Sequence, residues 1–203
     1  WFRNFLNLSQ IVYCDGYGVQ VGAFLTSQRV NFRFTLPDWI NSLCQIAIEN
    51  NWSIFFLGAK PGISELAAKN LQKTFPDLTI ENFHGYFNKE GEENQQVLNL
   101  INKSSAQILL VGMGMPLQEK WICDNFQNLS NVKVILPVGA LFDYVAEVTP
   151  RGPEFLTNHG FEWLTRLIIE PKRLWHRYVI GIPLAFFRIL RYYFKFGNDN
   201  FEI

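Results

Sequence analysis

Three nearly unbroken apolar runs, each followed by a stretch with helical spacing, constrain the fold of this chain most strongly. A strand buried on both faces has such a continuous apolar sequence, whereas a strand with one solvated face alternates apolar and polar residues. The runs are WSIFFLG at 52–58, AQILLVG at 106–112 and VKVILPVG at 132–139. They predict an α/β fold with a mostly parallel sheet that is covered by helices on both faces.

Other segments complete this pattern. The runs QIVYC at 10–14 and LTIENF at 78–83 are predicted as further strands, and helical spacing is found at 36–51, 63–75, 91–105 and 117–129. In the last of these helices we expect Trp121 in the core. We expect Glu119 and Lys120 on a solvated helix face or in an ion pair.

Length and cysteine content narrow the class of protein. A chain of 203 residues can bury a sizeable core as one α/β domain without disulfides. Its three cysteines lack CxxC or CxxH spacing, which argues against a disulfide framework and a zinc site and is typical of a reducing cytoplasm. No signal peptide is recognisable, and because the chain starts in mid-pattern at Trp1, we expect part of the natural N-terminus to be missing.

The net charge of zero hides an asymmetry. Residues 1–162 hold 11 Lys and Arg against 15 Asp and Glu, whereas residues 163–203 hold 7 against 3 and are rich in aromatic and aliphatic side chains. This combination favours an anionic membrane surface over a nucleic acid as partner. The apolar run 179–187 is far shorter than the roughly 20 residues of a spanning helix, so a peripheral, interfacial segment is predicted. The alternative is a helix packed on the domain or in an oligomer interface.

Glycine-rich turns gather where strands are predicted to end, and ligands of parallel sheets bind beyond the carboxyl ends of the strands. The turns are DGYG, LGAKPG, VGMGMP and VGALFD, and their glycines permit close backbone approach. The helix N-terminus near Leu117 offers free N–H groups to a phosphate. Asp15 is either a turn residue or a catalytic base. The chain has no GxGxxG, no P-loop motif and no DxD pair, so metal-bound diphosphate is not indicated.

Six blocks in order resemble the WecG/TagA/CpsF family of bacterial glycosyltransferases: DGYGV, FFLGAKPG, HGYF, VGMGMPLQEKWI, VGALFD and FEWLTRLIIEPKRLWHRY. The resemblance spans about residues 9–178. It implies a Rossmann-like sheet with a C-terminal helical appendage that associates with the membrane. It further implies transfer of a sugar, with inversion, from a UDP-sugar to a lipid-diphosphate-linked saccharide at the cytoplasmic membrane face.

The resemblance also implies roles for individual residues. Asp15 matches the proposed catalytic base and Gln118 an active-site glutamine. The positions expected to bind substrate are Gly16, Gly18, Gly58, Tyr86, Gly112, Gly114, Asp143, Arg166, Arg173 and Arg177. The three arginines fall in the appendage and are expected to reach the diphosphate. No metal or other cofactor is expected.

The sequence departs from the family pattern at two places, the segment 28–34 after DGYG and position 176. The usual ERVxGxD appears as QRVNFRF at 28–34, which puts the identity of donor or acceptor in doubt, and His176 stands where an arginine is common.

These inferences combine into one prediction. Residues 1–160 form the catalytic domain and residues 161–203 the appendage. The chain transfers an N-acetylmannosamine-type sugar, or a related hexose or uronic acid, in cell-surface polysaccharide synthesis. It works as a peripheral protein, with a homo-oligomer possible and no nucleic acid partner. Two alternatives stay open: a non-catalytic, membrane-docked nucleotide-sugar-binding protein, and another Rossmann-like transferase such as a methyltransferase.

Overall fold

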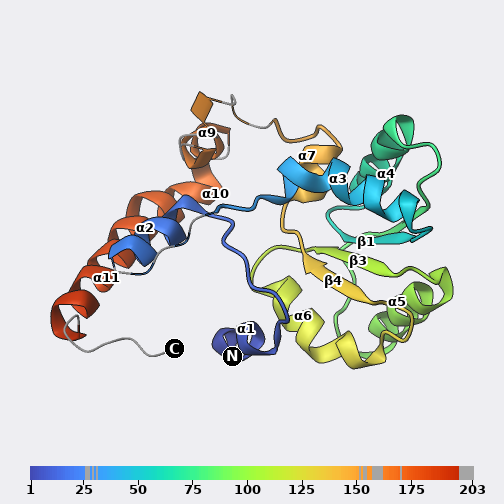
Figure 1. Cartoon of the computed structure of the whole chain (residues 1–203), viewed down its shortest axis with the longest axis horizontal. Coiled ribbons are helices and arrows are strands. Elements are labelled where there is room, and N and C mark those ends of the chain that lie inside the picture. The colour runs from blue at the N-terminus through green and yellow to red at the C-terminus, as the bar shows by residue number, and fades with distance from the viewer. Residues whose placement is uncertain are drawn as a thin grey trace. The chain divides into compact units, whose positions relative to one another are not determined.

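The computed structural model describes residues 1–25, 28, 30, 32–150, 152, 155, 156, 162–169 and 171–196, with seven of the helical residues described by their backbone alone. Contacts divide the chain into two compact units (Figure 1). The sheet unit comprises Trp1–Ile11 and Leu36–Pro150, and the helical unit comprises Val12–Thr35 and Arg151–Ile203. The division predicted at residue 160 stays a prediction. The packing adds that residues 12–35 belong with the C-terminal helices.

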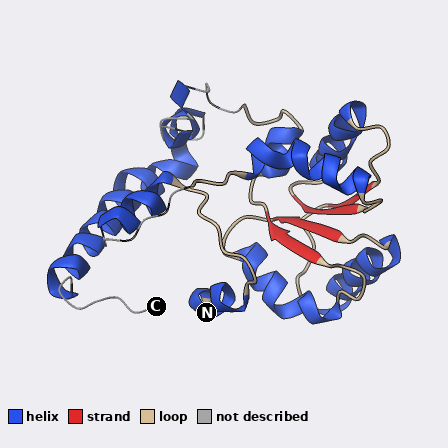
Figure 2. Cartoon of the chain, viewed as in Figure 1, coloured by secondary structure: helices blue, strands red, loops and turns tan. Residues whose placement is uncertain are grey.

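The sheet has four strands, and every pairing between them is parallel (Figure 2). They are β1 (Ile54–Gly58), β2 (Ile80–Phe83), β3 (Ile108–Gly112) and β4 (Val134–Pro137), in the order β2-β1-β3-β4. All residues of β1 and β3 are buried, as their continuous apolar sequence predicts. The connection after β1 runs to β2 and the connection after β3 runs to β4, so these two connections leave the neighbouring strands β1 and β3 in opposite directions. The adjoining carboxyl ends of β1 and β3 are therefore the topological switch point where such sheets bind ligands.

Helices cover both faces of this sheet, which confirms the predicted fold class (Figure 1). One face carries α3 (Leu36–Glu49), α4 (Ile63–Thr74) and α7 (Leu141–Val145), and the other carries α5 (Gly91–Ser104) and α6 (Leu117–Asn125). The turn Phe126–Asn128 continues α6, and α1 (Phe2–Leu8) contacts α6. In α3 the buried residues recur at helical spacing, as Leu36, Ile40, Cys44 and Ala47.

The hydrophobic core forms on both faces of the two central strands. Phe55 and Val111 pack with residues of α5 and α6, among them Trp121, which is only 2% exposed. This confirms the expected core position of Trp121. On the other face the rings of Phe56 and Phe142 stack with their centroids 4.7 Å apart. The tight packing of these rings limits what the ends of β1 and β3 can accommodate.

The prediction of a strand at QIVYC is wrong. Residues 11–16 contain no strand, and they lead into α2 (Tyr17–Leu25) of the helical unit. Ile11 and Val12 are 81% and 59% exposed, so this run lacks the burial that makes apolar runs into central strands. The glycines of DGYG therefore do not follow a strand of the described sheet.

The remaining described helices form the helical unit. They are α9 (Glu162–Ile169), α10 (Pro171–Trp175), the π-helix η2 (His176–Gly181) and α11 (Ile182–Phe196). Helix α2 packs on α11, and a Cβ added at Gly22 would lie 3.2 Å from Cδ1 of Ile189. Helix α11 continues η2 without a break, so the missing N–H of Pro183 removes one backbone donor from this helical run. Among the described residues no helix combines the length and apolarity that crossing a membrane requires.

Candidate functional site

The carboxyl edge of the sheet brings together three of the four predicted glycine turns. LGAKPG follows β1, VGMGMP follows β3 and VGALFD follows β4, while the loop HGYF follows β2. Since all four strands are parallel, these segments lie at one edge of the sheet. The fourth turn, DGYG, lies in the helical unit. The sequence thus placed three turns at the sheet edge correctly and one incorrectly.

Two of the candidate glycines are required by the packing of the protein itself. Gly58 and Gly112 are register neighbours, and a Cβ at Gly58 would lie 2.2 Å from the carbonyl oxygen of Gly112. That oxygen accepts a hydrogen bond of 2.9 Å from the N–H of Ala59. A Cβ at Gly112 would lie 2.7 Å from two ring carbons of Phe142. Contact of Gly58 and Gly112 with a substrate stays a prediction.

Replacing Gly112 by alanine is expected to lower the free energy of unfolding by about 1–3 kcal/mol, because the added methyl group overpacks a buried aromatic stack. Urea unfolding followed by circular dichroism measures the change. Gly18→Ala is the control, since a Cβ there has no described atom within 4 Å and alanine favours the helix. Unfolding at the same urea concentration as the unmodified protein would show that Phe142 moves aside at no cost.

The turns after β3 and β4 meet at the side chain of Gln118. Its amide oxygen accepts hydrogen bonds from the N–H groups of Gly114, at 3.1 Å, and Gly139, at 3.0 Å. The amide nitrogen of Gln118 donates to Oε1 of Glu119 at 2.8 Å. Gln118 and Glu119 are 5% and 3% exposed, so the expectation that Glu119 lies on a solvated face is wrong. The catalytic role of Gln118 and substrate contact by Gly114 stay predictions.

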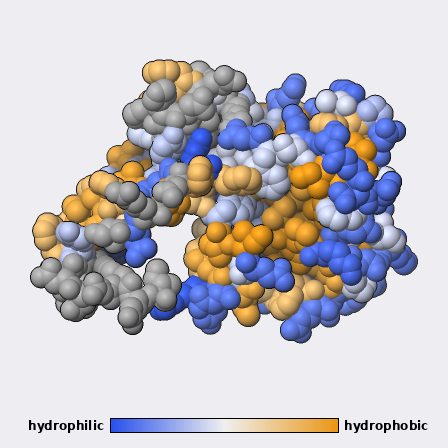
Figure 3. Space-filling view, in the orientation of Figure 1, coloured by the Kyte–Doolittle hydropathy of each residue, from blue (hydrophilic) through white to orange (hydrophobic). Residues whose placement is uncertain are grey.

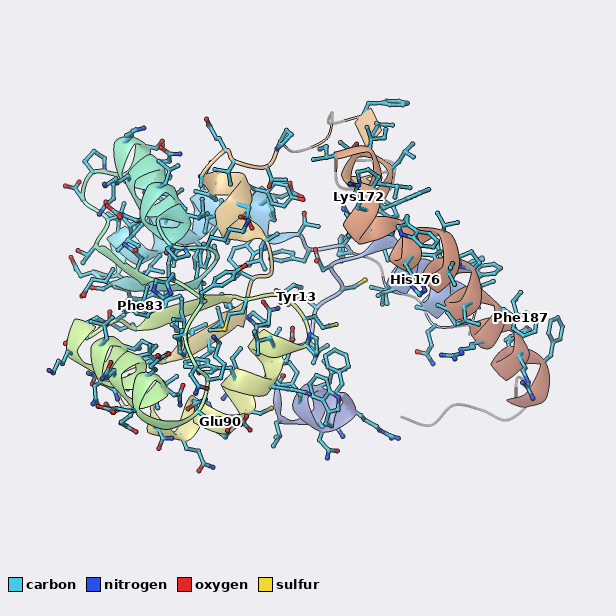
Figure 4. The ribbon with its side chains drawn as sticks, turned by 180° about the vertical axis from the view of Figure 1, so that it is seen from behind. Tyr13, Phe83, Glu90, Lys172, His176 and Phe187 are labelled. Carbon is cyan, nitrogen blue, oxygen red and sulfur yellow. The ribbon has the colours of Figure 1, made fainter. Side chains whose placement is uncertain are left out.

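The loop after β2 presents an exposed aromatic ring. Tyr86 is 66% exposed, and its N–H donates to Nδ1 of His84 at 3.2 Å. The ring of His84 stacks on that of Phe83, the last residue of β2, with the centroids 4.4 Å apart; Phe83 is labelled in Figure 4. The exposed ring of Tyr86 is available to stack on a nucleotide base, and its expected contact with the substrate stays a prediction.

The same loop holds a cation that sequence reasoning missed. Nζ of Lys89 donates to the carbonyl oxygens of Gly85, at 2.7 Å, and Phe87, at 2.6 Å, and lies 3.7 Å from the centroid of the Phe87 ring. Burial lowers the pKa of Lys89. Lys89 lies two residues after the block HGYF, and no pattern in the sequence separates it from an ordinary surface lysine. These contacts make Lys89 a brace of the loop.

Asp143 lies in the first turn of α7, directly after β4. Its carbonyl oxygen accepts hydrogen bonds from the N–H groups of Val148, at 3.1 Å, and Thr149, at 3.2 Å. The N-cap residue of α7 is Ala140, so Asp143 does not cap the helix. The side chain of Asp143 is half-buried. Its expected contact with the nucleotide stays a prediction.

Asp15 stands in an extended segment just before α2, and a second segment holds this one in place. The N–H of Phe34 donates to the carbonyl oxygen of Cys14 at 2.8 Å, and the rings of Phe34 and Tyr13 meet edge to face with their centroids 6.0 Å apart. Figure 4 labels Tyr13. Burial and the charge of Asp15 raise the pKa of Tyr13 to about 12, so its phenol stays protonated at neutral pH. Asp15 itself is exposed.

Arg33 is a second cation that sequence reasoning missed, and its charge acts on the same thiol as that of Asp15. The guanidinium of Arg33 lies 4.7 Å from the ring centroid of Tyr17. Burial raises the pKa of the Cys14 thiol, and the charge of Asp15 raises it further, while that of Arg33 lowers it. Both charges therefore act on Cys14. The departure QRVNFRF contains Arg33, but the residue pattern alone assigns it no place.

Gly16 and Gly18 differ from the glycines of the sheet edge. A Cβ at either position would have no described atom within 4 Å. The carbonyl oxygen of Gly16 accepts the hydrogen bond from the N–H of Val19 that opens α2. The described packing gives no steric reason for glycine at these positions, and their contact with a ligand stays a prediction.

The three arginines predicted to contact the diphosphate have described backbones only. Arg166 lies in α9, Arg173 in α10 and Arg177 in η2, and their side chains lie outside the described residues. Their role stays a prediction.

A metal centre is not formed by the part of the chain that the structure describes. No three side chains of His, Cys, Asp or Glu come together there as ligands of one ion. The expectation of metal-independent transfer remains to be measured.

Comparison with known proteins agrees with these features. The sequence model of the glycosyl transferase WecG/TagA/CpsF family matches residues 1–199. Similar proteins include two from Staphylococcus aureus, of strains MRSA252 and NCTC 8325 / PS 47, each called N-acetylglucosaminyldiphosphoundecaprenol N-acetyl-beta-D-mannosaminyltransferase. Each is 27% identical over 190 residues, which cover 94% of this chain and 72% of the relative. The chain belongs to the WecG/TagA/CpsF family of glycosyltransferases.

Proposed function

We propose that this glycosyltransferase moves an N-acetylmannosamine-type sugar, or a related hexose or uronic acid, from a UDP-sugar to a polyprenyl-diphosphate-linked saccharide. The family match over residues 1–199, with relatives named for transfer to N-acetylglucosaminyldiphosphoundecaprenol, carries the proposal. The product belongs to cell-surface polysaccharide synthesis, and teichoic acid is one such polymer.

The proposed reaction is a single displacement that inverts the anomeric carbon. The acceptor hydroxyl oxygen forms a bond to C1 of the donor sugar while the bond from C1 to the UDP oxygen breaks and UDP leaves with the electron pair. Asp15 takes the proton of the hydroxyl. Its exposed position supports this role, and so does the neighbouring Gly16, at which a Cβ would meet no described atom.

The nucleotide is proposed to bind at the carboxyl edge of the sheet. The ring of Tyr86 is exposed there to stack on uracil, and Asp143 follows β4 to bind the ribose or the base. Arg166, Arg173 and Arg177 are assigned to the diphosphate because a guanidinium matches phosphate geometry. The switch point between β1 and β3 supports this placement.

A peripheral position at the cytoplasmic membrane face is proposed from the helical unit. Phe187 and Phe194 of α11 are 63% and 82% exposed, and Arg188 and Arg191 are exposed beside them. Hydrophobic and hydrophilic residues alternate over this helix in Figure 3, and Phe187 projects outward in Figure 4. Phe187, Leu190, Arg191 and Phe194 recur at helical spacing and share one open face of α11. Aromatic rings and arginines in one helix suit the headgroup region of an anionic bilayer.

The same apolar surface supports a second arrangement. Val19, Val21 and Phe24 of α2 are also exposed, and such a surface suits a homo-oligomer as well as a lipid. Sedimentation equilibrium without lipid distinguishes the two arrangements, because an oligomer forms without vesicles.

Direct assay tests the proposed activity. A panel of UDP-sugars, including UDP-N-acetylmannosamine, is incubated with a short-chain lipid-diphosphate N-acetylglucosamine, and the product is detected by mass spectrometry. The expected product carries one added sugar. UDP binding without transfer would favour the alternative of a nucleotide-sugar-binding protein, and binding of S-adenosylmethionine in place of UDP would favour a methyltransferase.

Transfer is expected to stay within about twofold of its untreated rate when EDTA removes divalent cations, because arginines and helix N–H groups neutralise the leaving UDP. Initial rates with EDTA, and with Mg²⁺ or Mn²⁺ in excess, measure this. Loss of activity that returns with either metal would contradict the prediction and point to a metal-bound diphosphate.

A further inference from the structure

Two adjacent polar side chains are buried at the start of α6, where a helix usually exposes its polar residues. Gln118 and Glu119 are 5% and 3% exposed, and both lie in the first turn. Burial of an amide and a carboxylate is costly unless hydrogen bonds replace those to water. The hydrogen bonds of Gln118 and Glu119 therefore indicate why these two side chains are buried.

Gln118 joins two neighbouring turns of the sheet edge through one atom. Its Oε1 accepts from the N–H groups of Gly114 and Gly139, which follow β3 and β4. Both glycines have left-handed backbone angles, with φ of 80° and 56°. The two turns thus direct their N–H groups to one oxygen, and an amide oxygen has two lone pairs to accept them.

Glu119 determines which way the amide of Gln118 points. Nε2 of Gln118 donates to Oε1 of Glu119 at 2.8 Å. In the flipped amide, the nitrogen would face two N–H donors and the oxygen would face the carboxylate. Oε2 of Glu119 is buried with no hydrogen-bond partner among the described residues, which makes the carboxylate costly for stability. The need to orient the amide of Gln118 gives a reason why the Glu119 carboxylate is nevertheless present.

Helix α6 is fixed so that it cannot turn to relieve this burial. Nε1 of Trp121 donates to Oδ1 of Asn94 at 2.8 Å, and Nδ2 of Asn94 donates to Oδ1 of Asn125 at 2.7 Å. Nδ2 of Asn125 in turn donates to the carbonyl oxygen of Trp121 at 2.8 Å. This closed network joins α5 to α6 and holds the first turn of α6 in place.

We propose that Gln118 and Glu119 form a positioning pair: Glu119 orients the amide of Gln118, and Gln118 holds the turns after β3 and β4 at a fixed separation. Gln118 then acts through the backbone of the sheet edge, in place of the direct catalytic contact that the family resemblance implies. The inference rests on the proposed function for its activity measurement alone.

Exchanging the two side chains tests the pair. Gln118→Glu places two carboxylates face to face, whereas the double variant Gln118→Glu/Glu119→Gln allows every hydrogen bond to form again with the donor reversed. The full chain is measured for sugar transfer and for its thermal unfolding midpoint. The single variant is expected to lose at least about tenfold in turnover and about 5 °C or more in midpoint. The double variant is expected to regain most of both losses.

The outcomes separate the positioning pair from a direct role. A folded double variant no more active than Gln118→Glu would overturn the proposal, because the substrate then needs the amide of Gln118 itself. A double variant that fails to fold would overturn it as well. If the unmodified chain transfers no sugar, the proposed function fails, and recovery of the unfolding midpoint still tests the pair.

A matched exchange on the surface of α5 is the control. Glu92 and Gln96 are both exposed and four residues apart, and Glu92→Gln/Gln96→Glu leaves the net charge unchanged. The two substitutions are expected to act independently on the unfolding midpoint. Coupling as large as that between positions 118 and 119 would show that the recovery is a general charge effect and would overturn the proposal.

Discussion

Replacing Asp15 by asparagine is expected to lower the turnover of sugar transfer by about 10²-fold or more while UDP binding stays nearly intact. Asparagine has the same shape but takes up no proton, so the acceptor hydroxyl attacks without a base. The segment around Asp15 is held by the hydrogen bond from Phe34 to Cys14 and by ring packing on Tyr13, neither of which uses the carboxylate. Initial rates and UDP titration calorimetry measure the two effects.

The control for this variant is Asp77→Asn. Asp77 is exposed in the connection that enters β2, at the opposite edge of the sheet from the glycine turns. We expect transfer by this variant to match that of the unmodified chain. Near-normal transfer by Asp15→Asn would return Asp15 to the role of a turn residue, and loss of UDP binding along with transfer would indicate a misfolded segment.

Reversing two charges on α11 is expected to weaken binding to anionic vesicles by at least about 30-fold. The variant is Arg188→Glu/Arg191→Glu, and both side chains are exposed. Each basic residue at an anionic surface contributes about 1 kcal/mol, so the loss of two attractions alone amounts to about 2 kcal/mol. Co-sedimentation with phosphatidylglycerol-containing vesicles measures binding, and UDP titration shows whether the rest of the chain is intact.

A matched variant separates a local effect from net charge. Lys103→Glu/Lys133→Glu makes the same change of charge on exposed residues of the sheet unit, and we expect it to bind vesicles as the unmodified chain does. Equal weakening by both variants would mean that overall charge governs binding. Undiminished binding by the α11 variant would assign the exposed surface of this helix to another partner, such as a second copy of the chain.

Several features of the fold were predictable because their cause lies in local sequence. The apolar runs of β1 and β3 specify buried strands, and the helical spacing at 36–51 specifies the helix α3. Trp121 was expected in the core, and its 2% exposure confirms this. The family was also recognisable, because its blocks are long and specific.

Other features depend on contacts between distant segments. A five-residue apolar run such as QIVYC is consistent with a strand, but its fate depends on whether another strand pairs with it, and the segment instead enters α2. The hydrogen bonds of Lys89 to its own loop and the position of Arg33 over the ring of Tyr17 depend on loop conformations. The spacing of apolar residues in the sequence does not determine the conformation of a loop.

The sequence by itself determined the parallel sheet, the helices on its faces, the glycine turns at its edge and the family, since each follows from periodicity or from an ordered set of motifs. Tertiary structure alone decided that Gly58 and Gly112 serve internal packing and that Glu119 is buried beside Gln118. The physical reason is that burial and steric exclusion are properties of the neighbours a residue meets in space. For Gln118, to which Glu119 is hydrogen-bonded, those neighbours come from the turns after two different strands.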